Sequence, residues 1–117
     1  MLVEPQHPGN VGAVARVMSN FGCDELLLVG GCEINDDAKA RAKAGRPLLE
    51  TARRTASLKE ALAEAPVSVA TSGIVPEGDN RWQRAPHPIQ ELAGLLDGRQ
   101  PALVFGRENH GLDRGEL

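Results

Sequence analysis

The hydrophobic positions of the chain fall into short runs that are separated by longer segments with a helical spacing. The runs at positions 2–3, 25–29, 67–71 and 102–106 predict four strands, because each is bounded by proline, glycine or polar residues. After the first run, apolar residues recur at i, i+3, i+4 and i+7, which predicts a helix with one buried face. That face consists of Val11, Val14, Ala15, Met18 and Phe21.

Residues that favour helix ends predict where the first two helices begin and stop. Asn10 is the expected N-cap of the first helix, and Gly22 is its expected C-terminal stop. Asp36 or Asp37 begins a second helix, rich in alanine and lysine, that is expected to end near positions 45–47. A glycine and a proline in that last segment favour a break in the helix.

The second half of the chain has weaker helical patterns. Ser57 and Glu60 form a capping box, which predicts a helix that runs to about position 65. A polar loop is expected over 72–88, and a short helix follows it at 89–96. Each of these helical segments therefore separates two of the predicted strands.

The alternation of strands and helices predicts the fold class. Strand–helix–strand units with helical connections of this length form parallel βαβ crossovers. We therefore expect one α/β domain over residues 1–117, built on a mostly parallel sheet with helices on both faces. Ligands of such sheets bind at the carboxyl ends of the strands. Three loops are expected at this edge of the sheet, namely 4–12, 71–84 and 106–112.

Composition narrows the classes of function. The chain carries 13 basic and 16 acidic residues, a formal net charge of −3, which disfavours a protein that coats nucleic acid by bulk charge. The apolar runs are too short to span a bilayer, and the first residues do not resemble a secretory signal. Cys23 and Cys32 match no metal or redox spacing, and His7 and His110 do not have the spacing of a metal pair. We expect a cytoplasmic protein that binds no metal.

Two segments at the expected ligand edge carry candidate chemistry. The glycines of the loop 4–12 allow a ligand to approach closely, and the helix start that follows favours an anion, although a tight turn with a cap accounts for the same residues. Arg16 points away from the buried face of the first helix and is long enough to reach toward the crevice. The segment 105–112 presents Glu108 in a turn flanked by glycines. A solvated arginine and an ordinary loop carboxylate are the alternative interpretations.

Two motifs taken together resemble a known family. The first motif is Asn10-x-Gly12-Ala13-x-x-Arg16, and the second, near the other end, is Phe105-Gly106-Arg107-Glu108-x-x-Gly111-Leu112. In order and spacing they are similar to the SpoU/TrmH class of SPOUT RNA methyltransferases, and the similarity extends over nearly the whole chain. Residues 2–10, which lead into the first motif, most resemble the TrmJ-like branch. That branch methylates ribose 2′-hydroxyls in the tRNA anticodon loop.

The resemblance implies a fold, a cofactor and an assembly. The family has an α/β trefoil-knot fold, takes its methyl group from S-adenosylmethionine, and forms a homodimer whose active site uses both subunits. Asn10 and Arg16 match the first motif, whose arginine acts at the target ribose hydroxyl, and Glu108 matches the acidic residue of the second motif. The cofactor-binding positions implied by the match are Thr71, Ser72, Gly73 and Gly106.

The chain departs from the family pattern at its C-terminal end. Family members continue past the second motif with another strand, a third motif and a closing helix, whereas this sequence stops at Leu117, one turn into an expected helix. In the family, that part forms the threaded tail of the knot, a wall of the cofactor pocket and part of the dimer interface. We therefore expect the 117-residue chain alone to bind cofactor poorly and to be inactive, which calorimetry would test.

The implied reaction transfers a methyl group from a sulfonium to a ribose oxygen. Positioning of the two reactants is expected to supply most of the rate enhancement. Deprotonating a guanidinium near neutral pH costs about 7 kcal/mol, which is large compared with the gain from base catalysis. Arg16 is therefore favoured as a group that orients the ribose or its phosphate and stabilises the developing oxyanion. A phosphate-assisted base is the alternative role.

Because the net charge is negative, RNA binding must come from local basic surface. Trp82 could stack on an unpaired base, or it could pack over its own loop. A solvated helix face is likewise the alternative for the basic residues. Ribosomal rather than transfer RNA as substrate, and a non-catalytic module that binds a nucleotide or RNA, are the alternative functions. The candidate RNA-binding residues are Arg41, Lys43 and Arg46, with Arg53 and Arg54, and in a second patch Arg81, Trp82 and Arg84.

Overall fold

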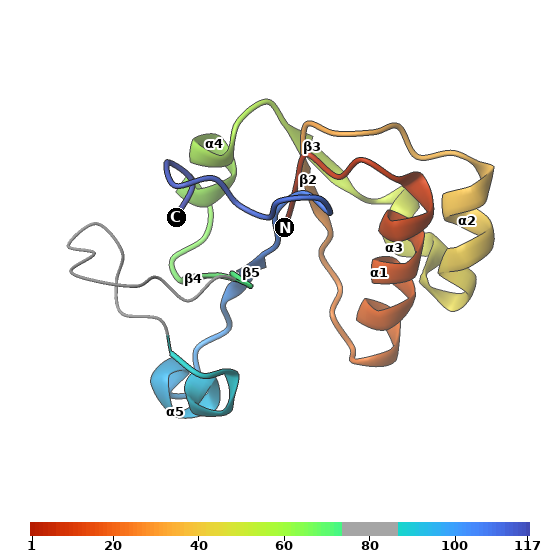
Figure 1. Ribbon diagram of the computed structural model, residues 1–117. Helices are drawn as coiled ribbons and strands as arrows, with labels where there is room; N and C mark the ends of the chain where they lie inside the picture. Colours follow the sequence, from red (N-terminus) through yellow and green to blue (C-terminus); the bar gives the residue numbers. More distant parts are fainter. Residues whose placement is uncertain (74–86) are drawn as a thin grey trace.

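The structure is a computed structural model that describes residues 1–73 and 87–117 (Figure 1). Its five strands are β1 (Leu2–Val3), β2 (Leu27–Val29), β3 (Arg53–Thr55), β4 (Ser68–Ala70) and β5 (Ala102–Val104). Its α-helices are α1 (Pro8–Asn20), α2 (Asp36–Ala42), α3 (Arg46–Glu50), α4 (Leu58–Ala63) and α5 (Leu92–Leu96). Two short 3₁₀ turns, η1 (Lys43–Gly45) and η2 (Ile89–Glu91), precede α3 and α5.

The described strands form a three-stranded sheet, β3-β2-β1, and a two-stranded sheet, β4-β5, and the strand pairs of both are parallel. β1 pairs with β2, β2 pairs with β3, and β4 pairs with β5. A parallel bridge between Leu2 and Phe105 joins β1 to β5, and the Val3 amide donates to the Phe105 carbonyl at 2.8 Å. The strands therefore lie in the order β3-β2-β1-β5-β4, and the predicted open, parallel α/β sheet is confirmed.

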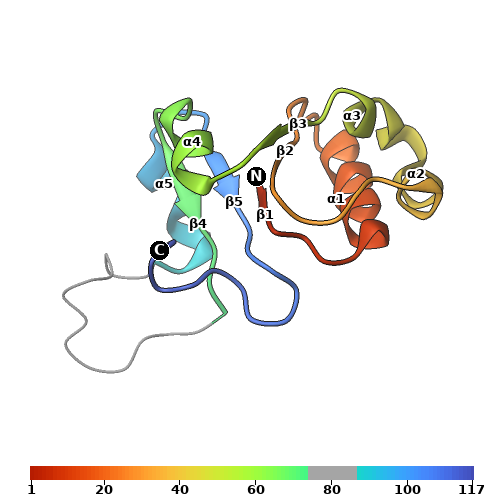
Figure 2. The same ribbon diagram turned by 90° about the horizontal axis from the view of Figure 1, so that it is seen from above.

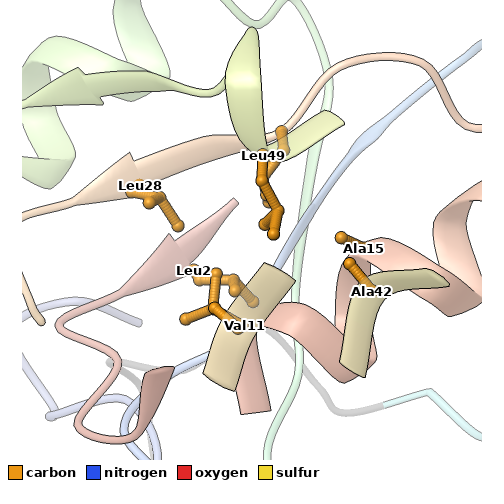
Figure 3. Packing of buried hydrophobic residues seen from close by; sticks show 8 residues of the cluster. Leu2, Val11, Ala15, Leu28, Ala42 and Leu49 are labelled. Atoms are coloured by element: carbon orange, nitrogen blue, oxygen red, sulfur yellow. The ribbon is translucent and has the colours of Figure 1, made fainter. Parts of the chain in front are cut away.

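The two faces of the sheet carry separate apolar clusters, because side chains alternate along a strand. Leu2 and Leu28 face α1, α2 and α3, where the buried residues of the cluster include Val11, Ala15, Ala42 and Leu49 (Figure 3). Val3, Leu27 and Val29 face the other way, toward Ala61 of α4. Figure 2 shows α1, α2 and α3 on one side of β1–β3, with α4 and α5 on the other.

The helices α1 and α2 approach each other closely because small residues lie between them. A side chain at Gly12 would bring its Cβ within 2.1 Å of the Ala38 carbonyl oxygen. At Gly45, in the turn that follows α2, the same atom would lie 2.3 Å from the Ala15 carbonyl oxygen. Ala15 and Ala38 are fully buried at these contacts. The glycines and alanines therefore set the short spacing of the two helices.

The start of α1 differs from the prediction, whereas its stop at Gly22 is confirmed: Gly22 follows the C-cap with a φ of 70°, and the next amide, of Cys23, donates to the Met18 carbonyl at 2.9 Å. The helix begins at Pro8, with His7 as N-cap, so Asn10 lies in its first turn and is not the cap. Proline is favoured at this position because its fixed φ suits the first turn, where no backbone donor is needed. Phe21, predicted as part of the buried face, is 81% exposed because the helix has already ended at Asn20.

The segment predicted as one helix from Asp36 to about position 47 is divided. Lys43, with φ of 50°, ends α2, and η1 leads into α3. Pro47 lies in the first turn of α3 and so begins a helix where it was expected to end one. The N-cap of α2 is Asn35, whose side chain accepts from the Ala38 amide.

One strand of the sheet was not predicted at all. β3, with the sequence Arg-Arg-Thr, pairs with β2 at the sheet edge, and its residues are exposed or half-buried. A polar strand of this kind has no apolar alternation to reveal it. The other four strands and the helix capped by Ser57 are confirmed, the last by a bond from the Glu60 amide to the Ser57 hydroxyl.

No helix in the part of the chain that the structure describes is long and apolar enough to cross a membrane. The C-terminal residues 113–117, expected to begin a helix, form turns, with the Glu116 and Leu117 amides both donating to the Asp113 carbonyl. The greater part of the predicted loop 72–88 lies outside the described residues.

Candidate functional site

The two sequence motifs meet at the carboxyl ends of β1 and β5. Because these strands are neighbours, the loop that follows β1 lies against the turn that follows β5. The Asn10 side-chain amide, in the first turn of α1, donates to a carboxylate oxygen of Glu108 at 3.2 Å. In open parallel sheets this edge is the usual place for a ligand, most often where the direction of strand order reverses. The expected convergence of the first and last motifs is thus present in the fold.

The Glu108 carboxylate is bound by donors of the first loop. Its oxygens accept the Gln6 amide at 2.8 Å and the His7 amide at 3.1 Å, besides the Asn10 side chain. Desolvation raises the pKa of Glu108, but these hydrogen bonds outweigh it and bring the pKa to about 2. The carboxylate also lies at the N-terminal end of α1, where a negative charge is favourable. The anion-binding end of this helix is therefore filled from within the chain.

Arg107 holds the same turn in place from the other side. Its Nε donates to Glu4 at 2.7 Å, and its two terminal nitrogens donate to the two carboxylate oxygens of Glu116 at 3.0 and 3.2 Å. The hydrogen bonds to Glu116 and Glu4 raise the pKa of Arg107 above its ordinary value. Its side chain is only 12% exposed. Arg107 therefore ties the end of β1 to the C-terminal turn of the chain.

Gly106 is required by the turn itself. Arg107 and Gly111 exchange backbone hydrogen bonds of 3.1 and 2.8 Å, which closes the turn over the end of β5. A Cβ at Gly106 would lie 2.0 Å from the Gly111 carbonyl carbon. Gly111 itself has a φ of 75°, which favours glycine. The absence of a side chain at position 106 is thus explained by a contact within the chain, apart from any cofactor.

The loop after β4 lies beside the end of β5. The Thr71 amide and the Thr71 hydroxyl both donate to the Val104 carbonyl at 3.0 Å. Ser72 and Gly73 follow at the same edge and are exposed. A Cβ built at Gly73 would meet no atom of residues 1–73 and 87–117 within 4 Å. Of the predicted cofactor-binding positions, Thr71–Gly73 lie where a ligand could bind.

Arg16 lies apart from these loops. It is exposed on α1 and lines a groove between α1 and α2. Arg41 and Lys43, two of the predicted RNA-binding residues, line the same groove. Arg41 forms an ion pair of 3.0 Å with Asp37. The structure therefore places Arg16 in one groove with two other cations.

The remaining predicted RNA-binding residues have contacts of their own or lie outside the described residues. Arg46 donates through Nε to the Lys39 carbonyl at 2.9 Å. Arg53 pairs with Glu25 and Glu64, and Arg54 donates to the carbonyls of Gly30 and Cys32. These two arginines of β3 are therefore used to hold the sheet edge. The second predicted patch, Arg81, Trp82 and Arg84, lies outside the described residues.

The ion pairs around Arg107 were not foreseen from the sequence. Arg107 and Glu116 lie in one short segment of alternating charge, but nothing in the pattern indicates Glu4 as a third member. The positive φ of Glu4, 44°, turns the chain at the end of β1. Within residues 1–73 and 87–117, no group of three His, Cys, Asp or Glu side chains is arranged to hold a metal ion.

The whole chain matches a family of known proteins. Residues 1–117 match the model of the SpoU rRNA Methylase family. Among curated proteins, the chain is 39% identical over its full length to the tRNA (cytidine-2'-O-)-methyltransferase TrmJ of Methanocaldococcus jannaschii, of which it covers 52%. It is 37% identical to the tRNA (cytidine/uridine/adenosine-2'-O-)-methyltransferase TrmJ of Pseudomonas aeruginosa, of which it covers 46%.

Solved structures give the same result. A probable methylase family protein from Haemophilus influenzae superposes with a TM-score of 0.83 at 27% identity, over 99% of this chain and 49% of that one. TrmJ from Z. mobilis superposes with a TM-score of 0.80 at 29% identity, over 98% of this chain and 52% of that one. The chain spans about half the length of the curated relatives that it matches, between 46% and 52% for the two named above. By its sequence and its fold, the chain belongs to the SpoU rRNA methylase family.

Proposed function

We propose that this protein methylates ribose 2′-hydroxyls of RNA, with S-adenosylmethionine as methyl donor and tRNA as substrate. The observation that carries the proposal is the bond between Asn10 and Glu108, which joins the two family motifs at the carboxyl edge of a parallel sheet. The full-length relatives named above are tRNA 2'-O-methyltransferases, which supports tRNA as the substrate. The family description names rRNA, and this substrate is the second candidate.

S-adenosylmethionine carries its methyl group on a positively charged sulfur, so it supplies an already activated methyl group. Thr71, Ser72 and Gly73 would hold the cofactor, since they lie at the ligand edge of the sheet and no described residue comes within 4 Å of a Cβ built at Gly73. Gly106, which follows β5, would form the adjacent wall of this site, and Gly111 closes its turn. The chain's contribution is then to hold the donor at a fixed place and angle to the ribose, which can supply ~7–11 kcal/mol.

We assign Glu108 a positioning role. A carboxylate with a pKa of about 2 is too weak a base to take a proton from a hydroxyl near neutral pH. Its three hydrogen bonds instead fix the loop before α1 and the side chain of Asn10. Arg16 is assigned to the target ribose, where its charge orients the substrate and stabilises the developing oxyanion.

We further propose that the active site is shared between two subunits of a homodimer. Arg16 lies in the groove between α1 and α2, whereas Thr71 is bonded to the end of β5. A cofactor beside Thr71 and a ribose beside Arg16 would meet more readily if the two residues came from different copies of the chain. We also propose that the full protein has the trefoil knot that the family resemblance implies, and that it is located in the cytoplasm.

The reaction itself is tested with the protein in its full natural length, unmodified tRNA and S-adenosylmethionine labelled in the methyl group. We expect label in tRNA at a linkage that resists alkaline hydrolysis, because a 2′-O-methyl group blocks cleavage there. Arg16→Ala is expected to lower kcat by about 10²–10³-fold, as for the loss of one oxyanion-stabilising donor. Arg99→Ala, which removes an arginine that binds the carbonyls at the end of α5, serves as the control. Label in rRNA alone, or on a base, would contradict the proposal.

The shared site is tested by mixing two inactive variants. Arg16→Ala removes the arginine, and Gly73→Phe fills the cofactor loop at a position where the described part of the chain has room for a Cβ. If each site takes Arg16 from one subunit and Gly73 from the other, the heterodimer has one intact site. Under random pairing about half of the dimers are heterodimers, and one of the two sites in each is intact. Mixing should therefore restore about a quarter of the wild-type activity. No recovery on mixing, with subunit exchange verified, would show that each site lies within one subunit.

A further inference from the structure

The groove between α1 and α2 is a built feature of the surface. The residues that α1 contributes, among them Arg16, Val17 and Asn20, follow a helical spacing next to the buried stripe of Val11 and Ala15. Since Gly12 and Ala38 bring the two helices close together, side chains on their outer surfaces flank one shared hollow. The packing of the helices therefore determines the position of this groove.

The charge of the groove is of one sign. Arg16 comes from α1, Arg41 from α2 and Lys43 from η1, so cations line it from both helices. Its other lining residues are alanines, a valine and an asparagine, and no carboxylate is among them. Asp37 does not line the groove, but its carboxylate forms an ion pair with the Arg41 Nε at 3.0 Å. Both side chains are more than half exposed. The groove thus has excess positive charge on a chain whose net charge is −3.

We propose that this groove, in which Arg16, Arg41 and Lys43 meet, binds backbone phosphates of the RNA substrate. The choice of RNA as the occupant rests on the proposed function, because a methylated strand must pass close to Arg16. Cations that contact phosphates contribute affinity independent of sequence and fix the register of the strand. Arg46, which was predicted to share this surface, is excluded because its guanidinium is bonded to the Lys39 carbonyl and does not line the groove.

Two changes of opposite sign test the groove in the full-length protein, with binding of an unmodified tRNA transcript measured over a range of salt concentrations. Lys43→Gln removes one phosphate contact, so the slope of log K against log salt is expected to become shallower by about 0.7–0.9. At 0.15 M salt this corresponds to a Kd raised about 5-fold. Lys59→Gln, the same substitution on α4 across the sheet, is the matched control and should leave the slope unchanged.

Asp37→Asn is expected to act in the other direction. It frees Arg41 from its ion pair, so the tRNA should bind more tightly and with a steeper salt slope. Asp36→Asn changes the net charge equally, but Asp36 pairs with Lys39 at 3.9 Å and not with Arg41, so it should have a smaller effect. A folding defect would weaken tRNA binding, so tighter binding by Asp37→Asn can only come from the change in charge at the groove.

The outcomes separate the groove from the reaction. If Lys43→Gln matches Lys59→Gln in tRNA affinity while methyl transfer persists, the groove does not bind RNA and the inference is wrong. The same holds if Asp36→Asn and Asp37→Asn have equal effects. If the wild type binds tRNA through the groove but transfers no methyl group, the proposed reaction fails and phosphate binding stands. An unchanged kcat at saturating tRNA, with a raised KM for Lys43→Gln, supports both.

Discussion

At the scale of single residues, the contact that organises the candidate site is the Glu108 carboxylate at the start of α1. It accepts two backbone amides and one side-chain amide from a loop about a hundred positions away in the chain. Charged hydrogen bonds of this kind are stronger than neutral ones, and their loss leaves the donors without a partner. Glu108 therefore links local order in the first loop to the second motif, and its protonation state should control that link.

The exchange Glu108→Gln is expected to reduce the free energy of unfolding at pH 7 by about 1 kcal/mol, a value discounted for the exposure of the carboxylate. The folded-state pKa of Glu108, about 2, lies below its ordinary value of 4.5. Its stabilising effect is thus complete above pH 4.5 and is lost as the pH falls toward 2. Denaturant unfolding at several pH values should show the difference between wild type and variant shrinking over this range.

Glu50→Gln serves as the control for this pH series, because it removes an exposed carboxylate at the end of α3. Its small effect on stability should not follow the same pH window. A gap between wild type and Glu108→Gln that stays constant from pH 7 to pH 2 would show that the Glu108 charge does not hold the loop.

The sequence predicted the partners of this contact but not their roles. Asn10 and Glu108 were placed in one site through the family motifs, and they are bonded to each other. Of the two interpretations of the first loop, an anion-binding loop or a tight turn with a cap, the contacts within the chain favour the turn, because the Gln6 and His7 amides donate to Glu108. Arg16, which was expected to reach toward the same edge, lines the groove between α1 and α2. Such details depend on which strands become neighbours, and one-dimensional spacing does not contain that information.

At the scale of elements, the spacing of α1 and α2 is set by two glycines whose role is steric. Glycine within a helix is unfavourable by about 1 kcal/mol relative to alanine, so Gly12 must be retained for a reason other than helix formation. The Ala38 backbone, 2.1 Å from the position of an added Cβ, provides that reason. The groove that contains Arg16 depends on this close contact.

Gly12→Ala is expected to destabilise the fold, because α1 and α2 must move apart to accept the methyl group. The clash is with backbone atoms and costs about 1–3 kcal/mol, which exceeds the gain in helix propensity. Gly94→Ala in α5 provides a control of opposite sign, since no atom of the described residues lies within 4 Å of the added Cβ. This second variant should be more stable than wild type by up to about 1 kcal/mol. Thermal unfolding measures both, and equal shifts would contradict the steric argument.

The elements show where pattern recognition works and where it fails. The apolar runs that form β1, β2 and β5 were predicted because their side chains enter one of the two cores. β3 was missed because Arg53 and Arg54 stabilise an edge strand through ion pairs and carbonyl contacts, which leave no hydrophobic signature. The break at Lys43 was also missed, since a positive φ at a lysine is not indicated by its sequence context.

At the scale of the whole molecule, the sheet joins the first third of the chain to its last part. β1 lies between β2 and β5, and the amide of Val3 reaches the carbonyl of Phe105 at 2.8 Å. The cluster on the α4 side of the sheet likewise combines Val3 and Leu27 with Val104 and Leu112. We therefore propose that residues 1–117 form one cooperative domain, as the length of the chain suggested.

This proposal predicts how a defect in one half of the sheet is felt in the other. Leu28 is fully buried in β2, and Leu28→Ala should reduce the free energy of unfolding by about 2–5 kcal/mol. The amides of Thr71 and Ala102 pair β4 with β5. In one cooperative unit, their free energy of opening, measured by hydrogen exchange, should fall by the same amount as that of the Val3 amide. Val104→Ala, on the far side of β1, should have the reciprocal effect on the amides of β2. If Thr71 and Ala102 keep their protection in Leu28→Ala, the chain holds two units that unfold separately, and the bridge from Leu2 to Phe105 is a contact between domains.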